Sequence, residues 1–232
     1  MTTFVLIHSP LVGPFTWSLV AEELRHRGIA VVVPVLSQDE EDERPYWQQH
    51  VEGIVQALSS LPAEQPPVVV GHSGAGMLLP AVGEASGRPV AAYVFVDAGI
   101  PEDGKSRLDL LGVELPEAAE QLRPLLAAGE RFPRWSDEEL AAVIPDRTLR
   151  QGMLAELRPQ LLRFFKEPIP VFSGWPDAPC AYLQFTPGYD VPAGLARREG
   201  WATAKMEGEH FHMLVDPAAV ADALISLIHG KL

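Results

Sequence analysis

The chain has 232 residues, of which 47% are hydrophobic and 21% are charged, and this size and composition fit one folded domain with its own core. Its 31 acidic and 18 basic residues give a formal net charge of −13 at pH 7, which argues against nucleic acid and membrane surfaces as partners. The single cysteine, Cys180, excludes an internal disulfide, and a small buried side chain is the role expected for it.

The N-terminus and the composition set the expected location. The first residues include no basic segment, long apolar stretch or small-residue cleavage site, and no apolar run approaches the length of a membrane span. We therefore expect a cytoplasmic protein. Arginine outnumbers lysine 14 to 4, and with the many alanines and prolines this is typical of a GC-rich bacterial genome. Composition leaves open whether the chain forms a homodimer.

Short apolar runs alternate with stretches of helical spacing in residues 1–100. In chain order, the expected strands are Phe4–Ile7, Ile29–Val33, Val68–Val70 and Val90–Val96, and the expected helices between them are 18–27, 46–61 and Met77–Ala85. The runs are continuously apolar, which is typical of parallel strands covered on both faces. The acidic stretch from Asp39 to Glu43 is predicted to be a solvated loop.

Residues 101–177 contain no convincing strand and several helix signals. Ser136 followed by Glu139 forms a capping box, and Asp146 can cap another helix. We predict a helical lid insertion over these residues.

The core of the predicted domain is then residues 1–100 and 178–232. Its last elements are strands at Ala181–Phe185 and Ala202–Met206 and a closing helix at Pro217–Ile228. The prediction is a single α/β domain with a doubly wound, mostly parallel sheet of about six strands.

A sharp turn is expected within Pro66–Gly76, where the run PPVVVGHSGAG leads from a buried strand into a glycine-bracketed serine, Ser73. In the G-x-S-x-G nucleophile elbow, the serine holds a strained strand-to-helix turn that exposes its hydroxyl. Gly71, Ala75 and Gly76 leave room for a helix to start against the strand, with Ala75 in place of the usual glycine.

A serine needs a general base within hydrogen-bond reach, and an acid to orient that base. His210 lies between the last predicted strand and the last helix, at the same edge of the sheet as Ser73, and we assign it as the base. His212 is the competitor, with a satisfied or solvent-facing side chain as its expected role.

Three motifs together resemble the α/β-hydrolase family over essentially the full chain. They are FVLIHSPLVGPFTW at residues 4–17, GHSGAG at 71–76 and HFHMLVDP at 210–217. The family order of serine, acid and histidine is satisfied. The resemblance implies a serine hydrolase whose sheet lacks the first two antiparallel strands of the family, because nothing before Phe4 can form them.

Two aspartates compete for the role of the acid. Asp190 follows the fifth strand, where the family most often carries its acid, and Asp97 ends the fourth strand, a position that some lipases of the family use. Asp97 is slightly favoured because a strand-end carboxylate is held more firmly than one that follows a Pro-Gly turn.

The oxyanion hole departs from the family pattern. By resemblance, Gly74 N–H is one donor, and the other comes from the third residue of an H-G-x segment after the first strand. That place is taken by Pro10, which has no N–H. The Ser9 hydroxyl and the Leu11 N–H are the candidate replacements.

The segment from His8 to Trp17 most resembles plant hydroxynitrile lyases and their methylesterase relatives. In the lyases a threonine stands where Ser9 is, and a lysine follows the catalytic histidine. Phe211 occupies that second place, which argues against lyase chemistry, whereas Ser9 keeps it open.

Two rival interpretations are weaker. Gly99–Ser106 matches the phosphate-binding pattern G-x-x-x-x-G-K-[ST], but Glu102 and Asp103 would place carboxylates where phosphate should bind. Four histidines could approach one edge of the sheet, yet no metal-ligand spacing is present. We expect no metal and no cofactor.

The predicted reaction is hydrolysis of a small carboxylic ester, thioester or lactone through an acyl-enzyme on Ser73. The substrate is expected to carry an apolar acyl or aryl group and to bind between the sheet edge and the lid. Phe15, Trp17 and His72 are the expected pocket residues. The alternative is a non-hydrolytic member of the fold, either a lyase or cyclase or a ligand-binding protein without hydrolase activity.

Overall fold

Six parallel strands form one sheet in the computed structural model of the chain, which describes residues 2–230. Residues 1, 231 and 232 of the predicted domain lie outside the described residues. The strands are β1 (Thr3–Ile7), β2 (Ala30–Val32), β3 (Val68–His72), β4 (Ala92–Val96), β5 (Cys180–Gln184) and β6 (Ala202–Lys205), in the spatial order β2-β1-β3-β4-β5-β6. The predicted doubly wound parallel sheet is confirmed.

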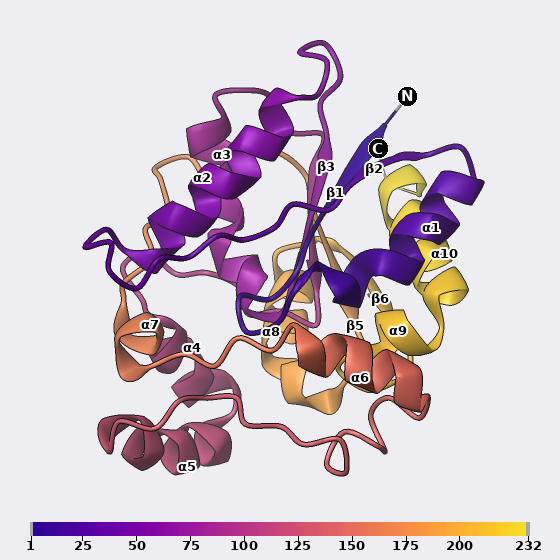
Figure 1. Cartoon of the computed structure of the whole chain (residues 1–232). Helices are drawn as coiled ribbons and strands as arrows, with labels where there is room; N and C mark the ends of the chain where they lie inside the picture. Colours follow the sequence, from indigo (N-terminus) through magenta and orange to yellow (C-terminus); the bar gives the residue numbers. More distant parts are fainter. Residues whose placement is uncertain (1, 231–232) are drawn as a thin grey trace.

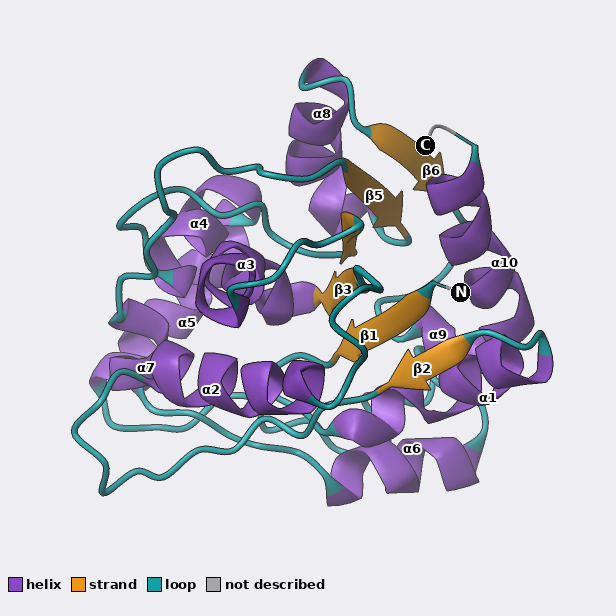
Figure 2. Cartoon of the chain, turned by 90° about the horizontal axis from the view of Figure 1, so that it is seen from above, coloured by secondary structure: helices purple, strands orange, loops and turns teal. Residues whose placement is uncertain are grey.

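Helices cover both faces of this sheet (Figures 1 and 2). One face packs against α1 (Ser18–His26), α9 (His212–Val215) and α10 (Pro217–His229), and the other against α2 (Tyr46–Ser59), α3 (Leu79–Ser86) and α8 (Asp190–Arg198).

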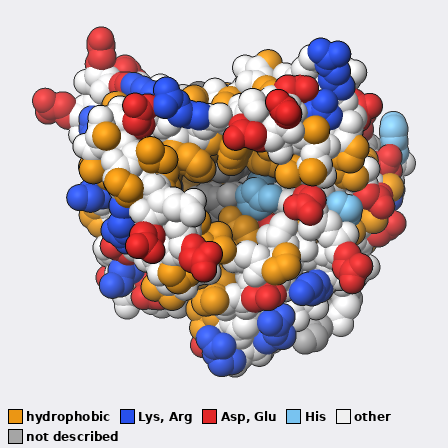
Figure 3. Space-filling model, turned by 90° about the horizontal axis from the view of Figure 1, so that it is seen from below, with side chains coloured by type: hydrophobic (Ala, Val, Ile, Leu, Met, Phe, Trp, Pro, Cys, Tyr) orange, Lys and Arg blue, Asp and Glu red, His pale blue; other side chains and the backbone are white. Residues whose placement is uncertain are grey.

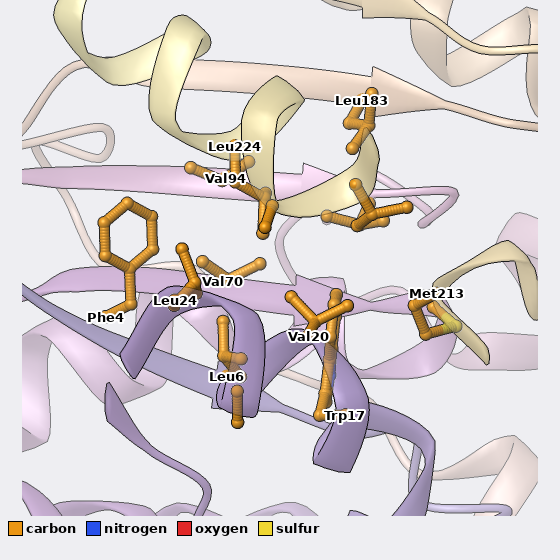
Figure 4. Packing of buried hydrophobic residues seen from close by; sticks show 14 of the residues in the cluster. Phe4, Leu6, Trp17, Val20, Leu24, Val70, Val94, Leu183, Met213 and Leu224 are labelled. Atoms are coloured by element: carbon orange, nitrogen blue, oxygen red, sulfur yellow. The ribbon is translucent and has the colours of Figure 1, made fainter. Parts of the chain in front are cut away.

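Alternation along the strands divides the buried side chains between the two faces. Phe4 and Leu6 of β1 belong to the cluster under α1 and α10 (Figure 4), whereas Val5 and Ile7 belong to the opposite cluster. Strands with both faces buried need apolar residues at every position, which explains the continuous runs in the sequence. Cys180, at the start of β5, is a buried free thiol, as expected.

The chain between β4 and β5 forms four helices in the described structure: α4 (Arg107–Glu114), α5 (Pro116–Ala127), α6 (Arg147–Ala155) and α7 (Leu162–Lys166). They lie beyond the carboxyl ends of the strands, in the lower part of Figure 1. Within residues 2–230, no helix combines the length and the apolar character that crossing a bilayer requires.

Two capping boxes form in this region, but only one of them starts a helix. Ser106 caps α4 through reciprocal hydrogen bonds with Asp109. The segment Gly99–Ser106, which matches the phosphate-binding pattern, is therefore the turn that leads into the insertion. The Ser136–Glu139 hydrogen bonds also form, but the helix predicted after them is wrong, because the following residues form only turns. Pro145 follows closely, and helical geometry is sterically disfavoured for the residue before a proline, which limits the length of any helix here.

Close packing at Gly76 fixes the turn after β3 against the end of β4. A Cβ added at Gly76 would lie 2.7 Å from the Gly99 carbonyl oxygen and 2.9 Å from the Ala98 Cβ. We expect Gly76→Ala to lower the free energy of unfolding by about 1–3 kcal/mol through overpacking. Urea denaturation measures this change.

Gly194→Ala is the matched control, because the nearest atom to its added Cβ is the Arg198 Nη1 at 3.5 Å. Alanine at this position in α8 should leave the protein as stable or slightly more stable. Equal stability of the two variants would contradict the packing constraint at Gly76.

Candidate active site

Ser73 lies at a strained turn directly after β3. Its φ angle is +54°, in the left-handed region that a non-glycine residue rarely adopts. The 3₁₀ helix η2 (Ser73–Leu78) starts at this residue, and a Cβ at Gly71 would lie 3.1 Å from the backbone of Ala75. The small residues around Ser73 therefore let strand and helix meet, and the serine faces a cavity.

The register of the sheet places Asp97 beside this turn. His72 of β3 pairs with Val96 of β4. Ser73 and Asp97, the residues that directly follow this pair, therefore lie next to each other at the end of the two strands. Asp97 also has a positive φ angle, +43°. Two adjacent strands thus end in strained residues at the same level, and backbone strain of this kind is typical of functional sites.

The Asp97 carboxylate is fully buried and accepts four hydrogen bonds. Phe185 N–H and Thr186 N–H donate to Oδ1 at 2.8 and 3.0 Å, and the Thr186 hydroxyl donates to Oδ2 at 2.9 Å. His210 Nδ1 lies 2.9 Å from Oδ2. These donors compensate the cost of burying the carboxylate and fix His210 with Nδ1–H on Asp97 and Nε2 available to other groups.

Asp190, the competing acid, has different partners. Its exposed side chain accepts a hydrogen bond from the Gln184 amide and pairs with Lys205 at 3.7 Å. The hydrogen bond from Gln184, with the charge of Lys205, lowers the pKa of its carboxyl. The structure therefore brings Asp97, and not Asp190, to His210.

The His210 ring is held on two further sides. Tyr189 stacks parallel to it, with ring centroids 5.3 Å apart and an angle of 7° between the planes. His72 Nε2 lies 2.9 Å from the His210 carbonyl oxygen. Burial lowers the pKa of His72 well below its usual value, so His72 is neutral and donates this hydrogen bond. His212, in contrast, packs edge-on against Phe185.

Phe15, Trp17 and His72 do not line the cavity, which corrects the predicted pocket residues. Trp17 and His72 are fully buried and contact each other edge-on, with centroids 6.1 Å apart. Phe15 packs against Gly152 of α6. The 3₁₀ helix η1 (Pro14–Trp17) directs the Trp17 ring back toward the core, where Figure 4 shows it beside Val20. His72 is the last residue of β3.

The loop after β1 presents Ser9 to the elbow. Leu11 N–H is directed at the Ser9 hydroxyl oxygen at 3.4 Å. The same oxygen lies 3.8 Å from where a Cβ on Gly74 would be, and Pro10 lies 3.6 Å from it. Since the Ser9 oxygen accepts this hydrogen bond, its own O–H proton is free to be donated elsewhere.

The buried ring of His8 supports this loop, and a second buried histidine, His50, lies on α2. His8 Nδ1 donates to the Ser9 carbonyl at 2.8 Å, and Leu36 N–H donates to its Nε2 at 3.4 Å. Burial lowers the pKa of His8 to about 4 and that of His50 to about 3, so both rings are neutral at pH 7. Among the described residues, no group of three or more His, Cys, Asp or Glu side chains could hold a metal ion.

The cavity has a volume of about 500 Å³ and contacts Ser73, Gly74, His210 and Tyr189. Figure 3 shows the hollow, framed largely by hydrophobic side chains, with a histidine in its wall. Most of its other lining comes from the helical insertion: Leu110, Leu111, Leu115, Leu122, Leu125, Phe132, Trp135, Phe164 and Phe165.

Sequence reasoning missed the polar residues of the cavity wall, among them Thr186, Tyr189 and Glu114. Thr186 and Tyr189 belong to the loop after β5, from which the sequence predicts only a candidate acid, Asp190. Their place directly beyond a strand end was an available signal, because the carboxyl ends of parallel strands bound the binding crevice. Glu114 had no signal in the sequence, since only the fold of the insertion brings it to the cavity.

Known proteins with similar sequences are α/β-hydrolases and esterases. The sequence model of the alpha/beta hydrolase family matches residues 4–223. Methylesterase 1 of Arabidopsis thaliana is 30% identical over 125 residues, and the match spans 50% of this chain and 48% of that enzyme. The carbendazim hydrolyzing esterase of Nocardioides sp. (strain SG-4G) is 24% identical over 98% of this chain and all of that protein.

Solved structures have the same fold. An extracellular alpha/beta-hydrolase from a Paenibacillus species superposes with a TM-score of 0.76 at 20% identity, over 98% of this chain and 99% of that one. This structure shows the shared fold, and the match to methylesterase 1 supports the resemblance to the methylesterase branch.

Two buried histidines, His8 and His50, give stability a pH dependence. Both rings are neutral in the folded protein, whereas an unfolded histidine takes up a proton near pH 6.5. Their contribution is complete above that pH and is lost as the pH falls from 6.5 toward about 4. Each histidine should lower the free energy of unfolding by about 2 kcal/mol between pH 6.5 and 5.

Urea denaturation at a series of pH values tests this. His50→Gln should flatten the acid side of the stability profile, and the exposed His26, replaced by glutamine as a control, should leave it unchanged. An identical slope in His50→Gln and the parent protein would refute the assignment.

Proposed function

This chain belongs to the alpha/beta hydrolase family, and we propose that it cleaves small carboxylic esters through an acyl-enzyme on Ser73. The observation that carries the proposal is that a strained serine and a histidine hydrogen-bonded to a buried aspartate contact one cavity. The names of both curated relatives support ester hydrolysis, since one is a methylesterase and the other a carbendazim hydrolyzing esterase.

His210 is the general base of the proposed reaction. It takes the proton of the Ser73 hydroxyl through Nε2 as the serine oxygen attacks the carbonyl carbon, and it then passes that proton to the leaving alcohol. The imidazolium formed in between is stabilised by the Asp97 carboxylate at 2.9 Å. A water molecule, activated by the same histidine, then hydrolyses the acyl-enzyme.

The oxyanion is stabilised by Gly74 N–H and the Ser9 hydroxyl. Pro10 has no donor, and Leu11 N–H is already directed at the Ser9 oxygen. Ser9 is 3% exposed and lies near Gly74, so its O–H can donate in a site with little water.

Tyr189 positions the nucleophile and the base. Its ring stacks on His210. Burial raises the pKa of its phenol, and a hydrogen bond with the Ser73 side chain lowers this pKa only in part. The phenol therefore stays protonated at neutral pH and shares a hydrogen bond with the Ser73 side chain.

The cavity supports a substrate with an apolar acyl or aryl group. Leucine and aromatic side chains of the insertion form most of its wall, and its volume of about 500 Å³ suits a small molecule. Thioesters and lactones present the same electrophilic carbonyl and belong to the proposed substrate class.

Hydrolysis of a panel of p-nitrophenyl esters and acyl thioesters tests the function. The parent protein should release p-nitrophenol from esters with medium-length acyl chains, and Ser73→Ala should lose the activity to the background rate. Turnover that persists in a folded Ser73→Ala protein would place the chemistry elsewhere.

The identity of the acid is tested by two single substitutions. Asp97→Asn should lower kcat by about 10⁴-fold, because an asparagine amide no longer fixes the productive histidine tautomer. Asp190→Asn removes an exposed carboxylate without a contact to His210 and should leave kcat within about twofold. The reverse ranking in steady-state kinetics would make Asp190 the acid.

Ser9 offers a matched pair for the oxyanion hole. Ser9→Ala should reduce kcat by about 10²–10³-fold with little change in KM, because the hydroxyl acts on the transition state. Ser9→Thr keeps the hydroxyl and should retain most of the activity. If Ser9→Ala keeps the parent kcat, another group supplies the second donor.

A further inference from the structure

Helix α4 presents one face to the cavity. Arg107, Leu110, Leu111 and Glu114 all contact it, and their spacing of three and four residues places them on one side of the helix. Glu114, the last residue of α4, is therefore a carboxyl group in a wall that is otherwise mainly leucine. The proposed mechanism gives this group no role.

A glycine makes room for the Glu114 carboxylate. A Cβ added at Gly99 would lie 3.0 Å from its Oε1 and 3.3 Å from its Oε2. Gly99 is two residues beyond Asp97 at the end of β4. The next residue after the helix, Leu115, packs near Gly188, the neighbour of Tyr189. The carboxylate thus lies where the insertion meets two of the strand ends that carry the site.

The carboxylate has no hydrogen bond and no ion pair with any residue in the described part of the chain. The other charged residue of α4 that contacts the cavity, Arg107, lies two turns away along the helix. Its Nη1 pairs with Glu167 at 2.8 Å, whereas its buried Nε and Nη2 have no partner among the described residues. Burial, and then the charge of Glu102, raise the pKa of Glu114 to about 7. Glu114 is partly buried in a mainly apolar wall, where its carboxyl is less well solvated than at an open surface, and a ligand that supplies a hydrogen-bond donor would stabilise it.

We propose that Glu114 is a specificity-determining residue that accepts a hydrogen bond from the group filling the cavity, so the preferred substrates carry a protonated amine or a hydroxyl on an otherwise apolar chain. That the ligand is a substrate rests on the proposed ester hydrolysis. The binding site itself does not depend on it. A protonated amine gains most, because it pairs with the ionised carboxylate against a mainly apolar wall.

Binding to Ser73→Ala protein tests the subsite without hydrolysis. Isothermal titration calorimetry at pH 8 compares three six-carbon probes: n-hexylammonium, 1-hexanol and hexanoate. Hexylammonium should bind at least about tenfold more tightly than hexanoate, and adding Glu114→Gln should remove that preference. Hexanol binding as tightly as hexylammonium, and weakened by Glu114→Gln, would also support the proposal and identify a neutral donor.

Glu117→Gln is the matched control, because it removes an exposed carboxylate from the next helix without touching the cavity. It should preserve the preference for hexylammonium. Gly99→Ala provides a second test, since its methyl group displaces the Glu114 oxygens while keeping their charge, and it should weaken hexylammonium binding.

Equal affinities for hexylammonium and hexanoate, or equal losses in Glu114→Gln and Glu117→Gln, would overturn the proposal. Hydrolysis of p-nitrophenyl hexanoate by the parent protein is measured separately. Absence of that activity would count against the proposed function, while the calorimetry would still decide whether Glu114 binds a donor.

Discussion

The register between β3 and β4 is the constraint on which the site depends. Because His72 and Val96 are paired, the residues that follow them, Ser73 and Asp97, leave the sheet at the same level. Both then adopt positive φ angles and turn out of the strand direction. A shift of one residue in either strand would turn that strand's side chains to the opposite face of the sheet and force both core clusters to repack, so packing of the core and geometry of the site enforce each other.

The third strand end completes this arrangement. Phe185 and Thr186, which follow β5, supply three of the four hydrogen bonds to the Asp97 carboxylate, and the fourth group is His210. Because the acid lies at the end of β4, the loop after β5 does not supply it. This loop instead places the ring of Tyr189 at the cavity. The same loop therefore contributes both the support of the acid and the stacking partner of the base.

Local motifs and strand ends could be predicted from the sequence because they depend on neighbouring residues. The glycines around Ser73 and the apolar run before it determine the turn. The position of His210 after the last strand places it at the same edge of the sheet as Ser73. The sequence favours Asp97 over Asp190 only slightly, because both follow strands at that edge and tertiary hydrogen bonds are what distinguish them. The pocket residues were wrong because the direction of Trp17 depends on η1, and because the insertion supplies its lining through long-range packing.

The central claim is that this geometry activates Ser73 as a nucleophile, and covalent labelling tests it most directly. Treatment of the folded protein with a fluorophosphonate probe, followed by peptide mapping with mass spectrometry, should give one adduct, on Ser73. Labelling should be abolished by Ser73→Ala and strongly slowed by His210→Ala. No adduct in a protein shown to be folded, or an adduct on a different residue, would contradict the account and favour a non-hydrolytic use of the fold.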